Sequence, residues 1–129
     1  MLDEPTSGLD SFIALGIAKL LHRLAHERSK TIIVTIHQPS SGIFNYFDKL
    51  FLMAEGQIMY QGSASKAVRY FSKLGFQIPN YSNPADHFIK ALSVSYPKTD
   101  ADIAKLDHFT LNYSKKIHKK LTESFVVSQ

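Results

Sequence analysis

The pattern of hydrophobic and polar positions predicts a mixed α/β chain that begins with a long amphipathic helix. Between Ser11 and Arg28, apolar residues recur every three or four positions, which is the period of one helix face. The residues that form this apolar face are Ile13, Ile17, Leu20, Leu21 and Leu24. Asp10 or Ser11 is expected to cap the start of the helix by accepting hydrogen bonds from its free backbone N–H groups.

A β-branched run, "TIIVTI" at residues 31–36, follows this helix without strict alternation of apolar and polar residues. Such a run predicts a strand that is buried on both faces, as in a parallel sheet covered by helices. The next segment, "HQPSSGIFNYF", turns the chain, and Pro39 and Ser40 are expected to open a short helix. Lys49–Ala54 and Gln57–Tyr60 then predict two strands joined by a hairpin turn at Glu55–Gly56.

Two further helices are predicted after the hairpin. Ser63 or Ser65 is expected to cap a helix that continues to about Leu74. Asn83 as N-cap with Pro84 at the first helical position is a strong signal for the start of the second.

The pattern is weaker from about Ser93 onward, where we expect one short amphipathic helix from Leu111 to Leu121. Its lysines are expected to form a solvated face; these are Lys115, Lys116, Lys119 and Lys120.

Composition is that of an ordinary soluble globular domain, with 129 residues, 44% apolar and 20% charged. The chain has no cysteine, which excludes disulfides and thiolate metal sites. The net charge of +4 is not concentrated in one block, so no nucleic-acid partner is predicted. Its apolar runs are far shorter than the roughly 20 residues that a membrane-spanning helix needs. By itself the chain is expected to be soluble and cytoplasmic.

The opening stretch, "LDEPTSGLDS", has the residue types of a nucleotide-hydrolysing site. It reads as the end of a buried strand, and ligands of parallel sheets bind at the carboxyl ends of the strands. In such hydrolases the first carboxylate, here Asp3, helps to hold Mg²⁺, and the second, Glu4, orients and deprotonates a water. His37 follows the β-branched run and can contact the same γ-phosphate from a neighbouring strand.

These segments resemble a known family. "LDEPTSGLDS" is similar to the Walker B motif and D-loop of ATP-binding-cassette (ABC) ATPases, and "IIVTIHQPSS" to their H-loop. The Gln38–Ser41 continuation, "GQIMYQGSASKAVRYFSKLGF" and "NPADHFIKAL" resemble the ABCG (White-type) half-transporters. The resemblance covers residues 1–93, and residues 94–129 resemble only the variable linker that precedes the transmembrane domain.

The resemblance implies the C-terminal part of a P-loop (RecA-like) ABC ATPase domain, an α/β fold with a parallel sheet and flanking helices. It makes Asp3 the Walker B aspartate, which binds Mg²⁺, Glu4 the catalytic glutamate and His37 the switch histidine. ATP would be bound between two such domains, and the D-loop that crosses to the partner corresponds to Ser7, Gly8, Leu9 and Asp10. The implied protein is a dimeric half-transporter that exports lipophilic substrates or sterols, with this domain at the cytoplasmic face of a membrane.

The G-x-x-x-x-G-K-[ST] phosphate loop and the "SGGQ"-type signature of this family are not found in the sequence. We therefore expect the C-terminal part of an ATPase domain, cut at an internal methionine and inactive without its N-terminal half and transmembrane domain. The faces of the Ser11–Arg28 and Ser65–Leu74 helices are then expected to lack partners.

Two other functions fit the same residues. The chain can be a non-catalytic interaction module or relic that docks onto a full-length half-transporter through its D-loop and H-loop faces. It can also belong to an ABC-type ATPase of DNA repair or chromosome maintenance, although those proteins lack the "HQPSS" and "NPADHF" flanks.

His22 and His26 have the i, i+4 spacing of a helical zinc site. No third ligand is evident in the sequence, and the two histidines lie among Lys19 and Arg23. A solvated polar face is therefore predicted for them.

Overall fold

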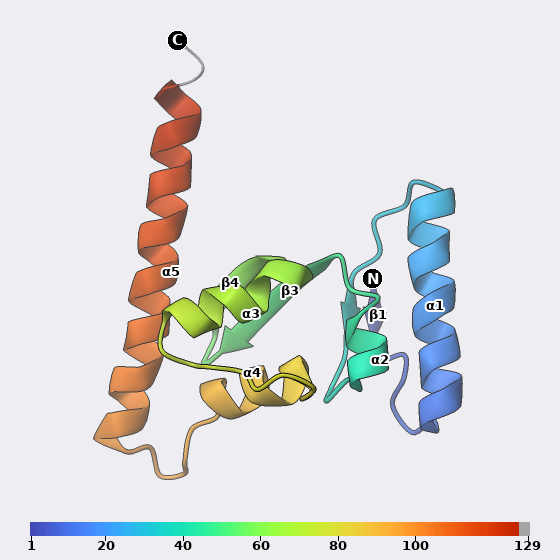
Figure 1. The fold of residues 1–129 in the computed structure, drawn as a ribbon, viewed down its shortest axis with the longest axis horizontal. Helices are drawn as coiled ribbons and strands as arrows, with labels where there is room; N and C mark the ends of the chain where they lie inside the picture. Colours follow the sequence, from blue (N-terminus) through green and yellow to red (C-terminus); the bar gives the residue numbers. More distant parts are fainter. Residues whose placement is uncertain (127–129) are drawn as a thin grey trace.

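The computed structural model describes residues 1–126, with side chains as far as Lys120. Within this range the chain forms two small sheets and five helices. The elements, in chain order, are β1 (Leu2–Asp3), α1 (Ser11–Glu27), β2 (Val34–Thr35), α2 (Ser41–Phe44), β3 (Lys49–Ala54), β4 (Gln57–Ser63), α3 (Ala64–Lys73), α4 (Pro84–Leu92) and α5 (Asp100–Val126). In Figure 1, α1, β1 and α2 lie at one end of the molecule, α5 lies at the other, and the β3–β4 hairpin lies between them with α3 and α4.

The first sheet is a parallel pair in which Leu2 is opposite Val34 and Asp3 is opposite Thr35. The predicted strand at residues 31–36 is therefore present but shorter, and its predicted burial is wrong. Ile33 is 55% exposed and Thr35 is also exposed. A strand is buried on both faces only when the sheet is covered on both sides, and this sheet has two short strands.

The hairpin prediction is confirmed. β3 and β4 pair in antiparallel register from Lys49 opposite Ser63 to Ala54 opposite Gln57. The two residues between the strands, Glu55 and Gly56, have φ of +50° and +73°. Positive φ at both central positions is what a two-residue turn of type I′ requires.

The main hydrophobic core lies between the hairpin and the three C-terminal helices. Its largest fully buried side chains, each at most 1% exposed, are Met59, Tyr60, Phe71, Phe88 and Phe109. Phe71 of α3 is at the centre, because its ring lies 4.8 Å from that of Phe88 in α4 and 5.2 Å from that of Phe109 in α5.

The C-terminal helix differs from the prediction. The expected Leu111–Leu121 helix is part of the longer α5, and Leu106, Phe109 and Tyr113 on it are buried. These residues repeat at three- and four-residue spacing, so the sequence contained the pattern that predicts a buried helix face here. One lysine also departs from the expected solvated face, because Lys116 Nζ lies 4.5 Å from the centre of the Tyr70 ring.

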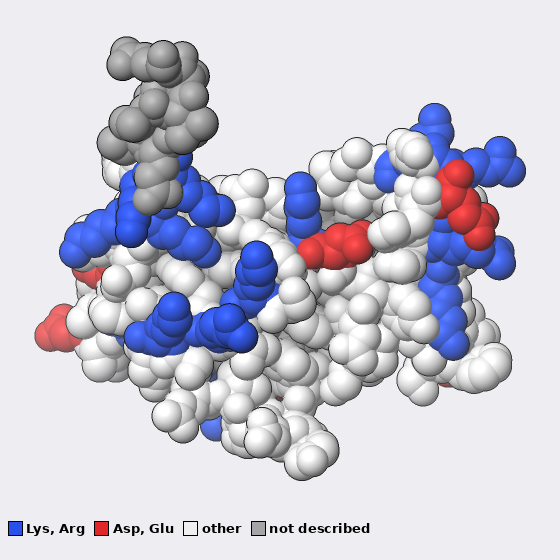
Figure 2. Space-filling model, turned by 45° about the horizontal axis from the view of Figure 1, so that its top comes forward, with Lys and Arg blue, Asp and Glu red and all other residues white. Residues whose placement is uncertain are grey.

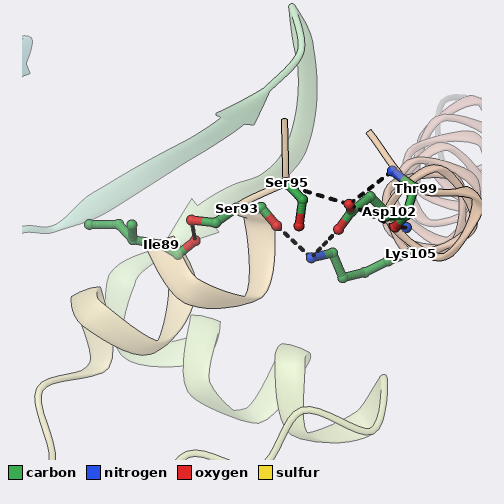
Figure 3. A network of polar contacts seen from close by, with 6 residues as sticks. All are labelled: Ile89, Ser93, Ser95, Thr99, Asp102 and Lys105. Carbon is green, nitrogen blue, oxygen red and sulfur yellow. Dashed lines mark hydrogen bonds and ion pairs between the residues drawn. The ribbon is translucent and has the colours of Figure 1, made fainter. Parts of the chain in front are cut away.

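A compact polar network fixes the start of α5 (Figure 3). Thr99 and Asp102 form a capping box: the Asp102 N–H donates to Thr99 Oγ1 at 3.2 Å, and the Thr99 N–H donates to Asp102 Oδ2 at 3.2 Å. The Ser95 N–H also donates to Asp102 Oδ2, at 3.1 Å. Lys105 donates to the Ser93 carbonyl and lies 3.5 Å from Asp102 Oδ1, so the network ties α5 to the end of α4.

The buried face of α1 also differs from its predicted apolar stripe. Ala14 and Ala18 are buried against Ile43, whereas Ile13 and Leu20 are 49% and 44% exposed. Part of the predicted apolar face is therefore exposed in the described part of the chain, where the expectation was that the helix would lack a partner. The same expectation is wrong for the Ser65–Leu74 helix, because Phe71 of α3 is fully buried in the core.

Two of the three N-caps predicted for α1, α3 and α4 form the expected side-chain hydrogen bonds to the helix backbone. The Asp10 side chain accepts from the N–H groups of Phe12 and Ile13, at 2.9 and 3.0 Å. Asn83 accepts from the Ala85 N–H at 3.2 Å. Ser63 holds the N-cap position of α3, but its side chain accepts no hydrogen bond from a backbone N–H of the helix and instead lies 2.8 Å from the Ser65 hydroxyl.

Candidate functional site

The carboxyl ends of β1 and β2 meet at the same edge of the parallel pair, as the sequence predicts. Thr35, the last residue of β2, joins the two ends through its hydroxyl group. Its Oγ1 accepts a hydrogen bond from the Glu4 N–H at 2.9 Å and donates to Asp3 Oδ1. This one side chain therefore fixes both the backbone of Glu4 and the carboxylate of Asp3.

A cleft of about 360 Å³ opens beyond this edge. Glu4 and the Ser7–Leu9 turn line one side, and His37 and Pro39 line the other. The structure thus brings together five of the seven predicted site residues, Glu4, Ser7, Gly8, Leu9 and His37, at one cleft. The catalytic and binding roles of these residues remain predictions.

The backbone changes conformation where each strand reaches the cleft. Glu4 has φ of +42° and Gln38 has φ of +47°, in the left-handed region that non-glycine residues seldom adopt. Such residues cost roughly 1–3 kcal/mol each and cluster at functional sites. Gly8, with φ of +72°, lies in the turn that follows Glu4 and adopts this conformation without the cost. The two strained positions were not predicted from the sequence.

The remaining two predicted residues, Asp3 and Asp10, lie beside the cleft instead of lining it. Asp3 is held by Thr35, and Asp10 caps α1. Because the Asp10 carboxylate occupies the first N–H groups of α1, this helix start is not free to receive a phosphate.

The carboxylates of this edge carry uncompensated negative charge. Asp3 and Glu4 are both exposed, and neither forms an ion pair within the described part of the chain. Carboxylate oxygens open to solvent are the ligands that Mg²⁺ prefers. The donor set of this edge therefore fits a magnesium ion.

Asn83 connects the cleft to α4, a contact that was not predicted from the sequence. Its Nδ2 donates to the Pro39 carbonyl at 2.9 Å while its Oδ1 caps α4 through Ala85. Pro39 is buried and lines the cleft directly after His37 and Gln38. An Asn side chain can cap a helix through its oxygen while its nitrogen donates elsewhere. Asn at this N-cap position was therefore the sequence feature that could have predicted the contact with Pro39.

Comparison with known proteins identifies the family. The sequence model described as "ABC-2 type transporter" matches residues 37–121, about two thirds of the chain. This chain belongs to the ABC-2 type transporter family. Its relatives place it in the ABCG (White-type) group.

Three relatives illustrate the similarity. Protein white of Drosophila melanogaster is 51% identical over 92 residues, which are 71% of this chain and 13% of that protein. Human ATP-binding cassette sub-family G member 8 is 42% identical over 104 residues, 81% of this chain and 15% of that protein. An uncharacterised ABC transporter ATP-binding protein/permease of Saccharomyces cerevisiae is 42% identical over 105 residues, 81% of this chain and 8% of that protein.

The chain spans between 8% and 19% of the length of the curated relatives it matches. The family match begins at His37 and includes the hairpin and most of α5. It does not include the Asp3–Asp10 segment, and the matching model describes a transporter family and not an ATP-binding domain. The match therefore establishes the family, while the assignment of residues 1–93 to an ATP-binding domain remains a prediction. None of the described helices combines the length and the apolar composition that crossing a bilayer requires.

Proposed function

We propose that this chain forms the hydrolytic edge of the ATP-binding domain of an ABCG-type transporter. Glu4 orients and deprotonates the attacking water, Asp3 helps to hold Mg²⁺ and His37 contacts the γ-phosphate. The turn formed by Ser7, Gly8 and Leu9, with Asp10 behind it, faces the partner domain of the dimer.

The observation that carries this proposal is the parallel pairing of β1 with β2. Glu4 and His37 are more than thirty positions apart in the chain, and this pairing brings the ends of their two strands together. With it, both line one cleft, and Thr35 holds Asp3 directly beside them. A base, a metal ligand and a phosphate-contacting imidazole at one sheet edge are the groups that phosphoryl transfer to water requires.

The chain supplies part of a nucleotide site. Most affinity for a triphosphate comes from the backbone N–H groups and lysine of a phosphate loop, and the sequence contains no such motif. We therefore propose that ATP is bound and hydrolysed when a phosphate loop and a signature motif are supplied by the rest of a dimeric transporter. The name of the yeast relative, an ATP-binding protein/permease, supports the proposal that ATP binding and transport belong to the whole protein.

In the whole transporter, ATP-driven closure of the dimer would move attached membrane helices and export lipophilic substrates. This places the domain at the cytoplasmic face of a membrane. The proposal follows from membership in the ABCG group, whose transport activity belongs to the whole protein.

A grafted dimer tests the metal assignment. Residues 1–93 would be joined to the N-terminal part of an ABCG-type ATPase domain, and ATP hydrolysis would be measured as a function of Mg²⁺ concentration. Asp3→Asn should require more Mg²⁺ for half-maximal rate, because one charged oxygen ligand is lost. Asp86→Asn, a change on exposed α4 surface, is the matched control and should leave the Mg²⁺ dependence unchanged. An unchanged Mg²⁺ dependence in Asp3→Asn would contradict the metal role.

A second candidate function is a non-catalytic module that docks onto a full-length half-transporter. The exposed apolar residues of α1 favour it, since Phe12 is 84% exposed and Ile13 and Leu20 are about half exposed. Co-expression with a full-length half-transporter tests it. Retention of the partner by the parent chain, with loss in Phe12→Ser, would support the module, and no retention by the parent chain would contradict it.

A further inference from the structure

The structure supplies a third potential ligand for the histidine pair of α1. His22 and His26 are one turn apart on the helix, and Asp48 lies just before β3. Asp48 Oδ1 is 3.4 Å from His26 Nε2 and 4.0 Å from His22 Nε2. One ligand atom from each residue lies within 4.8 Å of the other two. Residues that the sequence left as a pair therefore form a cluster of three.

A backbone hydrogen bond selects the tautomer of one imidazole in its neutral form. His26 Nδ1 lies 2.9 Å from the carbonyl oxygen of His22. A carbonyl can only accept, so this nitrogen carries the proton and Nε2 of the neutral ring presents its lone pair. That lone pair faces the Asp48 carboxylate. Orientation of a histidine through its second nitrogen is a recurring feature of metal ligands.

The other imidazole is held by ring contacts. The His22 ring stacks on that of His26, with centroids 4.2 Å apart, and Tyr46 packs edge-on against it at 5.6 Å. An imidazole lone pair that approaches a carboxylate is repelled by it unless a proton or a metal ion lies between them. A proton on one ring can satisfy one of these contacts, whereas a metal ion can satisfy all three.

The spacing fits a tetrahedral metal ion. Zinc–nitrogen and zinc–oxygen bonds of about 2.0–2.2 Å place neighbouring ligand atoms roughly 3.3–3.5 Å apart around a tetrahedron. The His26–Asp48 separation of 3.4 Å has this value, and the His22–Asp48 separation is 4.0 Å. The stacked rings, with planes 29° apart, must also rotate so that both in-plane lone pairs point at one ion. All three side chains are more than one third exposed, so an ion can enter from solvent and a water can complete the coordination.

The surrounding charge and the ligand types both affect which ion can bind. Lys19 and Arg23 flank the histidines on α1, and Lys49 follows Asp48 in the chain. Figure 2 shows Lys and Arg side chains gathered at the end of the molecule that α1 forms. Positive neighbours weaken the binding of every divalent cation, so the ligand types decide between ions. The cluster offers one carboxylate, whereas proteins bind Mg²⁺ and Ca²⁺ through several oxygen ligands. Imidazole ligands favour Zn²⁺, Cu²⁺ and Ni²⁺ instead.

We propose that His22 Nε2, His26 Nε2 and the Asp48 carboxylate bind one divalent transition-metal ion, with Zn²⁺ as the physiological candidate. The ion would clamp α1 to the segment that leads into β3. The clamp matters because the buried contact of α1 consists of Ala14 and Ala18, two small side chains. The site is separate from the cleft at Glu4 and does not depend on the proposed ATPase function.

Cobalt titration of the full chain tests the proposal. Metal-free chain would be titrated with Co²⁺, followed by visible absorption, and then with Zn²⁺ in competition. We expect one ion per chain, displaced by Zn²⁺ and not by millimolar Mg²⁺. His22→Gln and Asp48→Asn should each weaken binding by at least about 10-fold, the loss that even outer-shell changes cause. His108→Gln, an exposed histidine of α5, is the matched control and should bind as the parent does.

Chemical modification gives a second readout that needs no variant. Zn²⁺ should protect His22 and His26 from diethylpyrocarbonate, while the exposed His108 reacts at the same rate with or without Zn²⁺. Far-ultraviolet circular dichroism confirms that each protein sample retains its helices. The proposal is overturned if helical parent chain binds no Co²⁺, if the His22 and Asp48 variants bind as tightly as the parent, or if Zn²⁺ protects no histidine of α1.

Discussion

The hydroxyl oxygen of Thr35 accepts a hydrogen bond from the backbone N–H of Glu4 at 2.9 Å. The same hydroxyl group donates its proton to the Asp3 carboxylate. A polar side chain at the end of β2 thus holds the carboxylate of Asp3 and the backbone of Glu4. The positions of Asp3 and of the Glu4 backbone therefore depend on β2 as well as on β1.

Replacing this hydroxyl should disturb the site more than the fold. Thr35→Val keeps the β-branched shape and removes both hydrogen bonds, which contribute about 0.5–1.5 kcal/mol each. We expect a loss of roughly 1–2 kcal/mol in the free energy of unfolding, and slower ATP hydrolysis in the grafted dimer. Thr31→Val, in the exposed segment before β2, is the control. Equal effects of the two changes would show that Thr35 does not position Asp3 and Glu4.

Asn83 allows its two contacts to be separated. Asn83→Asp retains the oxygen that caps α4 and loses the donor to Pro39, whereas Asn83→Ala loses both. We expect Asn83→Asp to reduce the free energy of unfolding by about 0.5–1.5 kcal/mol. Asn83→Ala should cost about 1 kcal/mol more. Urea denaturation measures both, and an Asn83→Asp variant as stable as the parent would show that the Pro39 contact contributes nothing.

Asp102 should make the docking of α5 sensitive to acid. Hydrogen bonds from the Thr99 hydroxyl, the Thr99 N–H and the Ser95 N–H lower the pKa of Asp102 from 3.8 to about 2. Because the pKa is lower in the folded chain, the stabilisation is complete above about pH 4 and is lost as the pH falls from 4 towards 2.

Asp102→Asn should therefore remove part of the acid sensitivity in this pH range. Thermal unfolding of parent and variant would be compared at about pH 6 and pH 3. Asp100→Asn changes an exposed carboxylate at the same helix start and is the control. The same loss of stability on acidification in the parent and in Asp102→Asn would contradict the proposed linkage.

The burial of α5 is tested by two substitutions on the helix. Phe109 is fully buried and Leu111 is 59% exposed. Phe109→Ala should lower the free energy of unfolding by about 3–5 kcal/mol, because it leaves a cavity in the main core. Leu111→Ala should stay within about 0.5 kcal/mol of the parent. Similar small losses for both would mean that the segment behaves as the variable linker that the sequence suggested.

Features of the fold that depend on neighbouring residues were predictable. The turn at Glu55–Gly56 is defined by two residues, and the starts of α1 and α4 by Asp10 and Asn83. Each involves a short-range preference that the sequence displays directly. Burial was harder to predict, because the periodicity of α1 locates its apolar face without revealing whether another element covers it. Ala14 and Ala18 are buried because α2 happens to lie against them.

The same distinction applies to the site. The meeting of Glu4 and His37 was predictable, because the carboxyl ends of parallel strands share one edge. The hydrogen bonds of Thr35, like the approach of Asp48 to the histidines of α1, join residues far apart in the chain. No local pattern encodes such pairs, so they emerged only from the three-dimensional structure.

The account depends most directly on Glu4 as the group that activates water. In the grafted dimer, Glu4→Gln keeps the shape and one hydrogen-bonding oxygen but removes the base. General-base removal costs about 10²–10⁴ in rate, so hydrolysis should nearly vanish while ATP still binds and the closed dimer accumulates. Glu27→Gln, at the exposed end of α1, is the matched control and should hydrolyse ATP as the parent does.

The decisive measurement is trapped nucleotide per dimer, made beside the hydrolysis rate on the same sample. The account predicts that Glu4→Gln retains unhydrolysed ATP and turns over at least about 100-fold more slowly than the parent. Hydrolysis by Glu4→Gln at close to the parent rate, with no accumulation of ATP, would contradict the assignment of this site.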